Sequence, residues 1–239
     1  MKAIIIGAGN IGALKDHEST DSGPPYLTHA KAVRDSEFEL MGFIDTDDVN
    51  ESAAMGKWCC KNVTHNDEFE ADIFVIATPP EIHHEIAMQV LAYEPKGVVI
   101  EKPCGANLQE CVEIVEAYQH ANVPLVVNYQ RRYSKLLYNI AKMPLERVFI
   151  AYRGGFDYSG GHAYDLENML SDSRAHVQVY RDDSIVPAME IVSNGNTINP
   201  DLSFAFLDLY VNLHDHIIDG TPLLSPGVNA IYPHLMNNE

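Results

Sequence analysis

A glycine-rich turn near the start of the chain has the residue types and spacing of a phosphate-binding site. The apolar run over residues 2–6 leads directly into Gly7-Ala8-Gly9-Asn10-Ile11-Gly12, a G-x-G-x-x-G pattern. Gly7 permits the tight turn, Gly9 lets backbone amides approach a pyrophosphate, and Gly12 allows close helix–strand packing, with the anion at the helix N-terminus. The pattern alone also fits an ordinary glycine turn. Support for a dinucleotide site must therefore come from later elements.

An acidic residue follows the next expected strand. The sequence predicts an inserted loop over residues 13–25, because Gly23-Pro24-Pro25 cannot continue a helix, then a helix capped by Thr28 and a strand over residues 39–44. Asp45 comes directly after that strand, where a carboxylate can accept hydrogen bonds from adenosine ribose hydroxyls. The run Asp45-Thr46-Asp47-Asp48 would repel a 2'-phosphate, so it favours NAD(H) over NADP(H). The same run also fits a solvated acidic turn.

The elements that would position these residues alternate along the chain. Further strands are expected at residues 62–64, 73–77, 97–100 and 124–128, with helices over residues 51–57, 81–91 and 108–120. With the first two strands this makes a six-stranded alternating pattern, which is typical of a doubly wound parallel sheet. Ligands on such sheets bind beyond the carboxyl ends of the strands. The residues expected at those ends are Asp45, Thr78, Glu101, Lys102 and Asn128. If Gly7 to Gly12 formed an ordinary glycine turn, nothing would explain why these residues recur at the strand ends.

The pattern changes after residue 128. A helical stretch over residues 131–143 and a strand over 147–152 precede a helix beginning near His162. Strands over residues 177–181 and 188–194 and helices over 204–218 and from 227 onward follow. Strands here are few and connected differently, which predicts an α+β domain. The expected fold class is therefore α/β, with a Rossmann domain over residues 1–127 and a smaller α+β substrate or oligomerisation domain over residues 128–239.

Composition and charge narrow the expected partners. The chain has 239 residues, 46% of them hydrophobic, and a formal net charge of -18. Such an acidic balance argues against nucleic acid and anionic membranes as partners. No stretch has the length of a membrane span, and the run at residues 4–6 is too short for a secretory signal, so we expect a cytoplasmic protein. The histidine pairs His83-His84 and His214/His216 would diverge on helices, so we expect no metal site.

Five motifs, in this order, resemble those of the glucose-fructose oxidoreductase / inositol dehydrogenase (Gfo/Idh/MocA) family. After the glycine turn they are Ala77-Thr78-Pro79-Pro80 with His83, Glu101-Lys102-Pro103, Asn128-Tyr129-Gln130-Arg131-Arg132, and Gly161-His162-Ala163-Tyr164-Asp165. The Glu-Lys-Pro motif is much more specific than the glycine pattern. The resemblance implies a two-domain, nicotinamide-dependent enzyme of carbohydrate metabolism. Such an enzyme oxidises an alcohol on a sugar, polyol or nucleotide sugar, or reduces the ketone.

The resemblance also implies roles for particular residues. Removing hydride from a carbinol carbon requires a base at the hydroxyl. In the family the lysine of Glu-Lys-Pro contacts the reacting oxygen, so Lys102 would stabilise alkoxide charge, while His162 would be the general acid/base, oriented by Asp165. The implied cofactor-binding residues are Gly7, Gly9, Asn10, Ile11, Gly12, Asp45, Thr78, Pro79, His83, Glu101 and Asn128. The implied substrate-binding residues are Lys102, Arg131, Arg132, Tyr158 and His162.

Each of these residues also fits an ordinary structural role. Lys102 could be a surface lysine before a proline, and His162 a polar residue at a helix start. Asp165 fits a first-turn carboxylate favoured by the helix dipole. Arg131 and Arg132 could bind a substrate phosphate or carboxylate in two-point fashion, or one of them could pair with a surface carboxylate.

Two departures from the family pattern leave a second function open. Many members carry an acidic residue four positions before the histidine, where this chain has Tyr158, and the second domain is shorter than usual. These departures favour, as the alternative, a non-catalytic NAD-binding regulatory or partner subunit. A glycine-rich methyl-donor site is disfavoured because it does not require Glu-Lys-Pro. The expected partners are a sugar-like small molecule and further copies of the chain, in a homodimer or homotetramer.

Overall fold

The computed structural model describes residues 1–16, 26–60, 71–143, 146–171, 176–185 and 187–237. The chain forms two compact units: Met1–Asn128 with Ser203–Gly227, and Tyr129–Leu202 with Val228–Glu239. Among the expected features, the strand at residues 62–64 and most of the loop at residues 13–25 lie outside the described residues.

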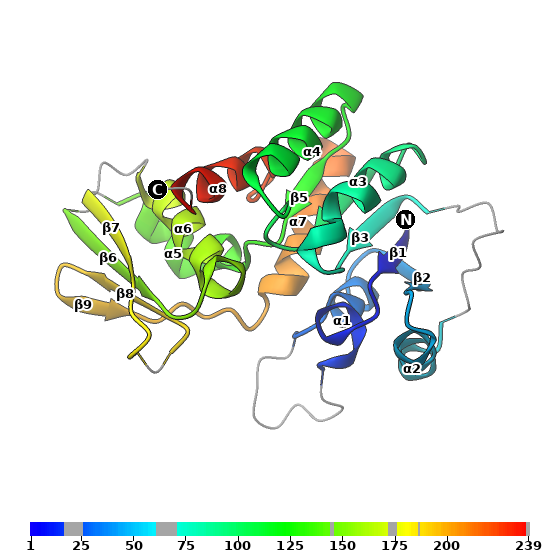
Figure 1. Ribbon diagram of the computed structural model, residues 1–239, viewed down its shortest axis with the longest axis horizontal. Helices are drawn as coiled ribbons and strands as arrows, with labels where there is room; N and C mark the ends of the chain where they lie inside the picture. Colours follow the sequence, from blue (N-terminus) through cyan, green and yellow to red (C-terminus); the bar gives the residue numbers. More distant parts are fainter. Residues whose placement is uncertain (17–25, 61–70, 144–145, 172–175, 186, 238–239) are drawn as a thin grey trace. The chain divides into compact units, whose positions relative to one another are not determined.

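A parallel sheet forms the centre of the first unit (Figure 1). Its five described strands are β1 (Lys2–Ile6), β2 (Glu39–Ile44), β3 (Ile73–Ile76), β4 (Gly97–Ile100) and β5 (Leu125–Val127), in the order β2-β1-β3-β4-β5. All neighbours pair in parallel. Strands β3, β4 and β5 are buried throughout, as continuous apolar runs require in a sheet covered on both faces. The doubly wound Rossmann fold predicted from the alternating pattern is confirmed.

Helices connect the strands of the first unit by the expected crossovers. They are α1 (His29–Arg34), α2 (Asp48–Trp58), the 3-10 turn Pro80–Ile82, α3 (His83–Leu91), α4 (Leu108–Ala121) and, from the later part of the chain, α7 (Ala205–Asp219). Thr28 caps α1, Asp47 caps α2 and Asn107 caps α4 through their side chains. Helix α3 packs beside α4, and α1 packs beside α7. The predicted cap at Thr28 is therefore present.

The segment after the glycine turn is shorter than a regular helix. It forms a π-helical turn over Asn10–Leu14, in which the Leu14 amide donates to the Gly9 carbonyl at 3.1 Å. Contacts distant in sequence end this turn: Lys57 Nζ donates to the carbonyls of Leu14 (3.0 Å) and Asp16 (2.6 Å). The Asp16 carboxylate accepts from the backbone amide of Leu27 at 2.7 Å and from the Thr28 hydroxyl. The expectation of an interrupted first helix holds here, and Asp16 joins the two ends of the interruption.

A mixed sheet and three helices make up the second unit. The sheet has the order β7-β6-β8-β9, with strands β6 (Arg147–Tyr152), β7 (His176–Arg181), β8 (Met189–Ser193) and β9 (Asn196–Ile198). Strand β7 is parallel to β6, and β8 is antiparallel to both β6 and β9. The helices are α5 (Lys135–Ala141), α6 (Gly161–Ser171) and α8 (Ile231–Asn237), with a 3-10 turn at Gln130–Tyr133, a π-helical turn at Phe156–Gly160 and a further 3-10 turn at Gly227–Ala230. This is the α+β arrangement expected after residue 128.

Helices α5 and α6 pack against the sheet of the second unit. The buried core there is formed by Leu137, Val148, Ile150, Tyr152, Ala163, Leu166, Leu170 and Ile191. Helix α6 contributes three of these side chains and packs against α5, α8 and strands β6 and β7. The start of α6, where His162 and Asp165 lie, is therefore fixed by packing on several sides.

The chain returns to the first unit after the second sheet. Ser225 Oγ donates to the Val127 carbonyl at 2.7 Å, and the Val127 amide donates to the Ser225 carbonyl at 3.1 Å. A Cβ placed on Gly97 of β4 would lie 3.1 Å from Leu213 of α7, so this helix packs closely on the sheet. The division into domains of residues 1–127 and 128–239 stays a prediction. In the structure, residues 203–227 pack with the first unit.

Candidate cofactor and active site

The three glycines of the N-terminal turn meet different surroundings. Gly7 has φ of +99°, and a Cβ on it would lie 2.6 Å from the Ala77 carbonyl. A Cβ on Gly12 would lie 1.9 Å from the Gly7 carbonyl oxygen. A Cβ on Gly9, in contrast, would meet nothing within 4 Å. Packing therefore explains Gly7 and Gly12, whereas Gly9 leaves open space in front of the backbone, as close approach of a pyrophosphate requires.

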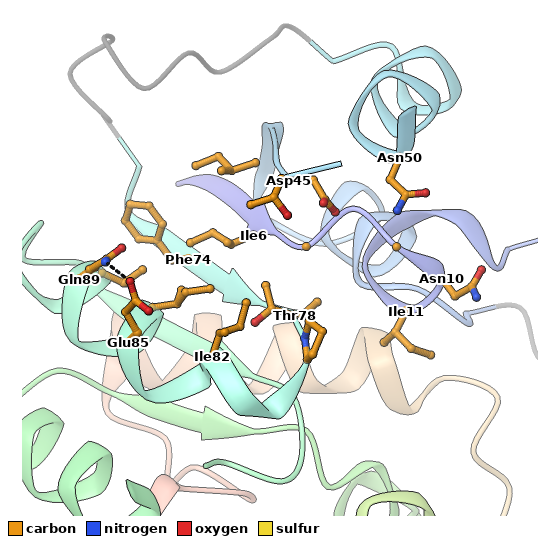
Figure 2. Close-up of a pocket in the computed structure, with 18 of the residues that line it drawn as sticks. Ile6, Asn10, Ile11, Asp45, Asn50, Phe74, Thr78, Ile82, Glu85 and Gln89 are labelled. Carbon is orange, nitrogen blue, oxygen red and sulfur yellow. Dashed lines mark hydrogen bonds between the residues drawn. The ribbon is translucent and has the colours of Figure 1, made fainter. Parts of the chain in front are cut away.

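A cavity of about 780 Å³ adjoins this turn (Figure 2). Seven of the predicted cofactor-binding residues line it: Gly7, Gly9, Asn10, Ile11, Asp45, Thr78 and Pro79. The predicted residues Gly12, His83, Glu101 and Asn128 are not among its lining. The lining residues that sequence reasoning did not place in a cofactor site are Ile6, Ile44, Thr46, Asn50, Phe74, Ala77, Ile82, Glu85, Ile86, Gln89, Val90 and Tyr93.

Five of the missed residues lie on α3 or its preceding turn, and Tyr93 follows the helix. Ile82 is 39% exposed and Tyr93 is 51% exposed, although both are large apolar side chains. Figure 2 shows Ile82 and Glu85 on the same side of the cavity, with the Gln89 amide donating to Glu85 at 3.1 Å. Exposed apolar side chains on a helix near a strand end were the one signal that could have indicated this wall of the cavity.

The Asp45 carboxylate is held by the backbone of the glycine turn. Its Oδ2 accepts from the Ala8 amide at 2.6 Å, and its Oδ1 accepts from the Asp47 amide at 2.9 Å. The two donors fix the orientation of the side chain at the cavity wall, and each carboxylate oxygen keeps further acceptor capacity. Asp45 is therefore fixed where a hydroxyl-bearing ligand could donate to it.

Thr78 and His83 shape the end of β3. The Thr78 hydroxyl oxygen is buried and has no hydrogen-bond partner among the described residues. The fully buried ring of His83 places Nε2 2.9 Å from the Thr78 carbonyl oxygen and Nδ1 2.8 Å from that of Pro103. Burial lowers the pKa of His83, although the hydrogen bonds to the Pro103 and Thr78 backbone and the charge of Glu101 act in the opposite direction. His83 thus joins the segments after β3 and β4, and its predicted cofactor contact stays a prediction.

Glu101 belongs to a buried hydrogen-bonded group at the carboxyl end of β4. Its Oε1 lies 2.9 Å from His29 Nε2 and 2.6 Å from Asn128 Nδ2. Burial alone would raise the pKa of Glu101, but the donors from His29 and Asn128, together with the charge of Lys102, hold it below its ordinary value. An ionised carboxylate therefore directly precedes Lys102, which is half-buried.

In the second unit, Asp165 is paired with Arg132. Arg132 Nε donates to both carboxylate oxygens, at 2.8 and 2.9 Å, and both side chains are buried. Burial raises the pKa of Asp165 to about 6, although the charges of Arg132 and Arg131 act in the opposite direction. Burial also lowers the pKa of Arg131 to about 10. This ion pair engages the two side chains that were predicted to orient His162 and to bind substrate, and both roles stay predictions.

His162 lies near the start of α6. Its side chain is buried, and its ring stands edge-on to the Tyr129 ring with centroids 5.8 Å apart. Tyr158, in the preceding π-helical turn, is 60% exposed and lies against Gly154, where an added Cβ would be 2.9 Å from the tyrosine ring. Lys102 belongs to the first unit and His162 to the second. Their joint catalytic role stays a prediction.

The described residues lack two features. They contain no group of three or more His, Cys, Asp or Glu side chains that could hold a metal ion. Within the same ranges, no helix is long and apolar enough to cross a membrane.

Comparison with known proteins agrees with this geometry. The profile described as "Oxidoreductase family, NAD-binding Rossmann fold" (GFO_IDH_MocA) matches residues 1–129. The chain belongs to the Gfo/Idh/MocA family. The resemblance inferred from the five motifs is therefore confirmed, and the first unit of this family member is an NAD-binding Rossmann fold. A search of curated proteins finds no match.

Solved structures of oxidoreductases share the whole fold. An oxidoreductase from Agrobacterium radiobacter in complex with NAD+, L-tartaric acid and magnesium has a TM-score of 0.78 at 12% identity, covering 99% of this chain and 94% of its own. UDP-N-acetylglucosamine 3-dehydrogenase GnnA from Acidithiobacillus ferrooxidans has a TM-score of 0.77 at 14% identity, covering 100% and 95%. GenD2 from gentamicin A biosynthesis, in complex with NAD, has a TM-score of 0.75 at 14% identity, covering 100% and 92%.

Proposed function

We propose that this chain is an NAD(H)-dependent oxidoreductase that interconverts a hydroxyl and a ketone on a sugar, polyol or nucleotide-sugar substrate. The observation that carries the proposal is the open space in front of Gly9, beside a cavity whose wall holds the braced Asp45 carboxylate. Family membership supports the reaction class. The substrate class is supported by structural neighbours such as UDP-N-acetylglucosamine 3-dehydrogenase and GenD2 from gentamicin A biosynthesis.

The residues of the first unit fit a dinucleotide. The backbone of the glycine turn would hold the pyrophosphate, because Gly9 carries no side chain where the backbone faces open space. Asp45 would accept hydrogen bonds from the adenosine ribose. The negative charges of Asp45, Asp47 and Asp48 oppose a 2'-phosphate, so NAD(H) is the proposed cofactor in preference to NADP(H). When bound, the nicotinamide ring accepts or donates the hydride.

Lys102 and His162 would handle the proton that accompanies the hydride. The ammonium group of Lys102 would stabilise the negative charge that develops on the substrate oxygen. The imidazole of His162 would take the hydroxyl proton during oxidation and return it during reduction, since histidine titrates near neutral pH. Arg131, whose guanidinium belongs to the same unit as His162, would bind an anionic or hydroxyl group of the substrate.

A second candidate is a non-catalytic NAD-binding subunit of the same fold. Two observations favour it: the Asp165 carboxylate is paired with Arg132, and the position four residues before His162 carries an exposed tyrosine. Such a subunit would bind NAD through the first unit without transferring hydride. Cofactor affinity alone therefore does not separate the two candidates.

An NADH absorbance assay across a panel of sugars, polyols, keto-sugars and nucleotide sugars tests the proposal. We expect turnover with at least one panel member, and Lys102→Ala should lower it by at least about a hundredfold while NADH affinity is retained. The matched control is Lys96→Ala, because Lys96 is exposed and pairs with Asp72 at the opposite end of β4. Full activity in Lys102→Ala would contradict the assigned role of the lysine. NADH binding with no turnover across the panel would favour the non-catalytic subunit.

A further inference from the structure

Four buried side chains form a continuous hydrogen-bonded row in the first unit. Tyr210 of α7 places its hydroxyl 2.7 Å from Nδ1 of His29, the first residue of α1. His29 Nε2 lies 2.9 Å from Glu101 Oε1, which also accepts from Asn128 Nδ2 at 2.6 Å. His29, Asn128 and Tyr210 are each fully enclosed, and Glu101 is 9% exposed. The row thus joins two helices to the carboxyl ends of β4 and β5.

The chemistry of the four groups gives the row a definite direction. An ionised Glu101 carboxylate only accepts hydrogen bonds, so Nε2 of His29 must carry a proton. When the ring is neutral, Nδ1 is an acceptor for the Tyr210 hydroxyl. Asn128 must turn its amide nitrogen toward Glu101 for the same reason. The tautomer of His29 is therefore set by Glu101 on one side and Tyr210 on the other.

Packing fixes the orientation of the His29 ring as well. Phe206 stands edge-on to it, with ring centroids 5.0 Å apart and an interplanar angle of 78°. The Tyr210 ring is also edge-on, at 5.9 Å and 89°. A fully buried ring between two aromatic side chains has no room to rotate away from Glu101. The Nε2–H donor is thus held in place before any ligand binds.

Several titratable groups surround Glu101 from different elements. His29 contacts it from α1, Lys102 follows it in sequence, and the charge of Glu101 also acts on His83 of α3. Tyr210 of α7 acts through His29. Burial opposes the charged form of Glu101, and the donor from His29 is the largest of the effects that favour it. Removing that donor would therefore move the pKa of Glu101 upward.

We propose that His29 is a positioning residue of the cofactor site, which holds the Glu101 carboxylate at the end of β4 as an oriented acceptor for a hydroxyl group of the bound dinucleotide. The inference rests on the proposed function. Oε1 is occupied by His29 and Asn128, whereas the one hydrogen bond that Oε2 accepts from the described residues is a long one, 3.2 Å, from the Lys102 amide. Oε2 therefore keeps acceptor capacity for a ligand. Neither His29 nor Tyr210 contacts the cofactor in this proposal.

NADH titrations between about pH 6 and about pH 8 test the proposal with two variants of one residue. His29→Phe removes the donor, so the pKa of buried Glu101 rises and its carboxyl takes up a proton more readily toward the acidic end. We expect NADH affinity to fall about tenfold at about pH 6 and less at about pH 8, since a hydrogen bond to a charged group is lost. His29→Gln should restore the NADH affinity and the pH dependence of the wild type, because the glutamine amide can donate to Glu101. The matched control is His216→Gln on α7, whose ring bonds the Thr221 carbonyl at 2.8 Å and touches no member of the row.

Two outcomes of the titration overturn the inference. One is an NADH affinity of His29→Phe with the same pH dependence as wild type, and the other is an equal change in His216→Gln. Should His29→Phe fail to fold, ¹⁵N NMR of the wild-type histidine rings gives the second measurement. We expect the Nε2–H tautomer for His29, and the Nδ1–H tautomer would contradict the assignment. A wild-type chain that binds no NADH would instead refute the proposed function, while the NMR result would still decide the His29–Glu101 hydrogen bond.

Discussion

At the scale of single residues, we expect the charge at Asp45 to set the preference of the site between NADH and NADPH. We expect Asp45→Asn to raise affinity for NADPH relative to NADH by about tenfold, because the charge facing a 2'-phosphate is gone, although the single amide oxygen can keep only one of the two hydrogen bonds from the Ala8 and Asp47 amides. Paired titrations with the two cofactors measure this ratio. Glu116→Gln is the control, since Glu116 is an exposed residue of α4 outside the cavity lining. An equal change in both variants would show that net charge, and not Asp45, sets the preference.

The buried pair Arg132–Asp165 makes stability depend on pH. The folded-state pKa of Asp165 is raised to about 6 from an ordinary 3.8, so the folded chain binds the proton more tightly than the unfolded chain. This group therefore favours folding increasingly as pH falls from about 6 toward about 4, and it opposes folding above that range. Arg132→Met removes the cation, so we expect the free energy of unfolding to fall by about 3–5 kcal/mol at neutral pH and by less near pH 5.

Urea unfolding of Arg132→Met at several pH values measures this effect. The double variant Arg132→Met/Asp165→Leu is the control, because it removes the charge that the single variant leaves unpaired. It should recover most of the lost stability. A pH-independent loss in the single variant would show that lost packing, and not the unpaired carboxylate, is the cause.

At the scale of elements, we expect two glycines of the N-terminal turn to affect different properties: Gly7 the stability of the fold, and Gly9 the affinity for the cofactor. Gly7→Ala should lower the free energy of unfolding by about 1–3 kcal/mol, since its φ is positive and a Cβ would meet the Ala77 backbone. Gly9→Ala should leave stability nearly unchanged, because nothing lies within 4 Å, and should weaken NADH binding by about tenfold or more, equal to about 1.4 kcal/mol. Thermal unfolding and NADH titration of both variants measure the two effects. Unchanged NADH affinity in Gly9→Ala would place the pyrophosphate elsewhere.

Local patterns predicted the elements and the part of the site that lies within motifs. The apolar runs of β1, β3 and β4, and Thr28 as a cap, were readable because each depends on neighbouring residues. The π-helical turn at Asn10–Leu14 was not, because contacts from Lys57 and Asp16 end it. Hydrogen bonds between residues far apart in the sequence could not be predicted for the same reason. His29 and Glu101 are 72 positions apart, so nothing near His29 marks it as more than a helix residue.

At the scale of the whole molecule, the first unit includes residues 203–227, which follow the sheet of the second unit in the sequence. Helix α7 supplies Tyr210 and Phe206 to the buried His29, and Ser225 hydrogen-bonds the end of β5. A fragment that ends at residue 128 would lose both, and Nδ1 of the buried His29 would be left without its Tyr210 partner. Each such atom costs about 1–3 kcal/mol in addition to the apolar area exposed.

We therefore expect a fragment of residues 1–128 to melt well below the intact chain and to bind NADH weakly or not at all. A chain that joins residues 1–128 to residues 203–227 through a flexible Gly-Ser linker keeps α7 and Ser225. It should regain a cooperative thermal transition and NADH affinity within about tenfold of the intact chain, since every residue of the cavity wall lies before residue 94. Circular dichroism melts and NADH titration of the two chains compare them directly. Cooperative folding and full affinity in the fragment lacking residues 203–227 would show that the returning helix is dispensable for the cofactor site.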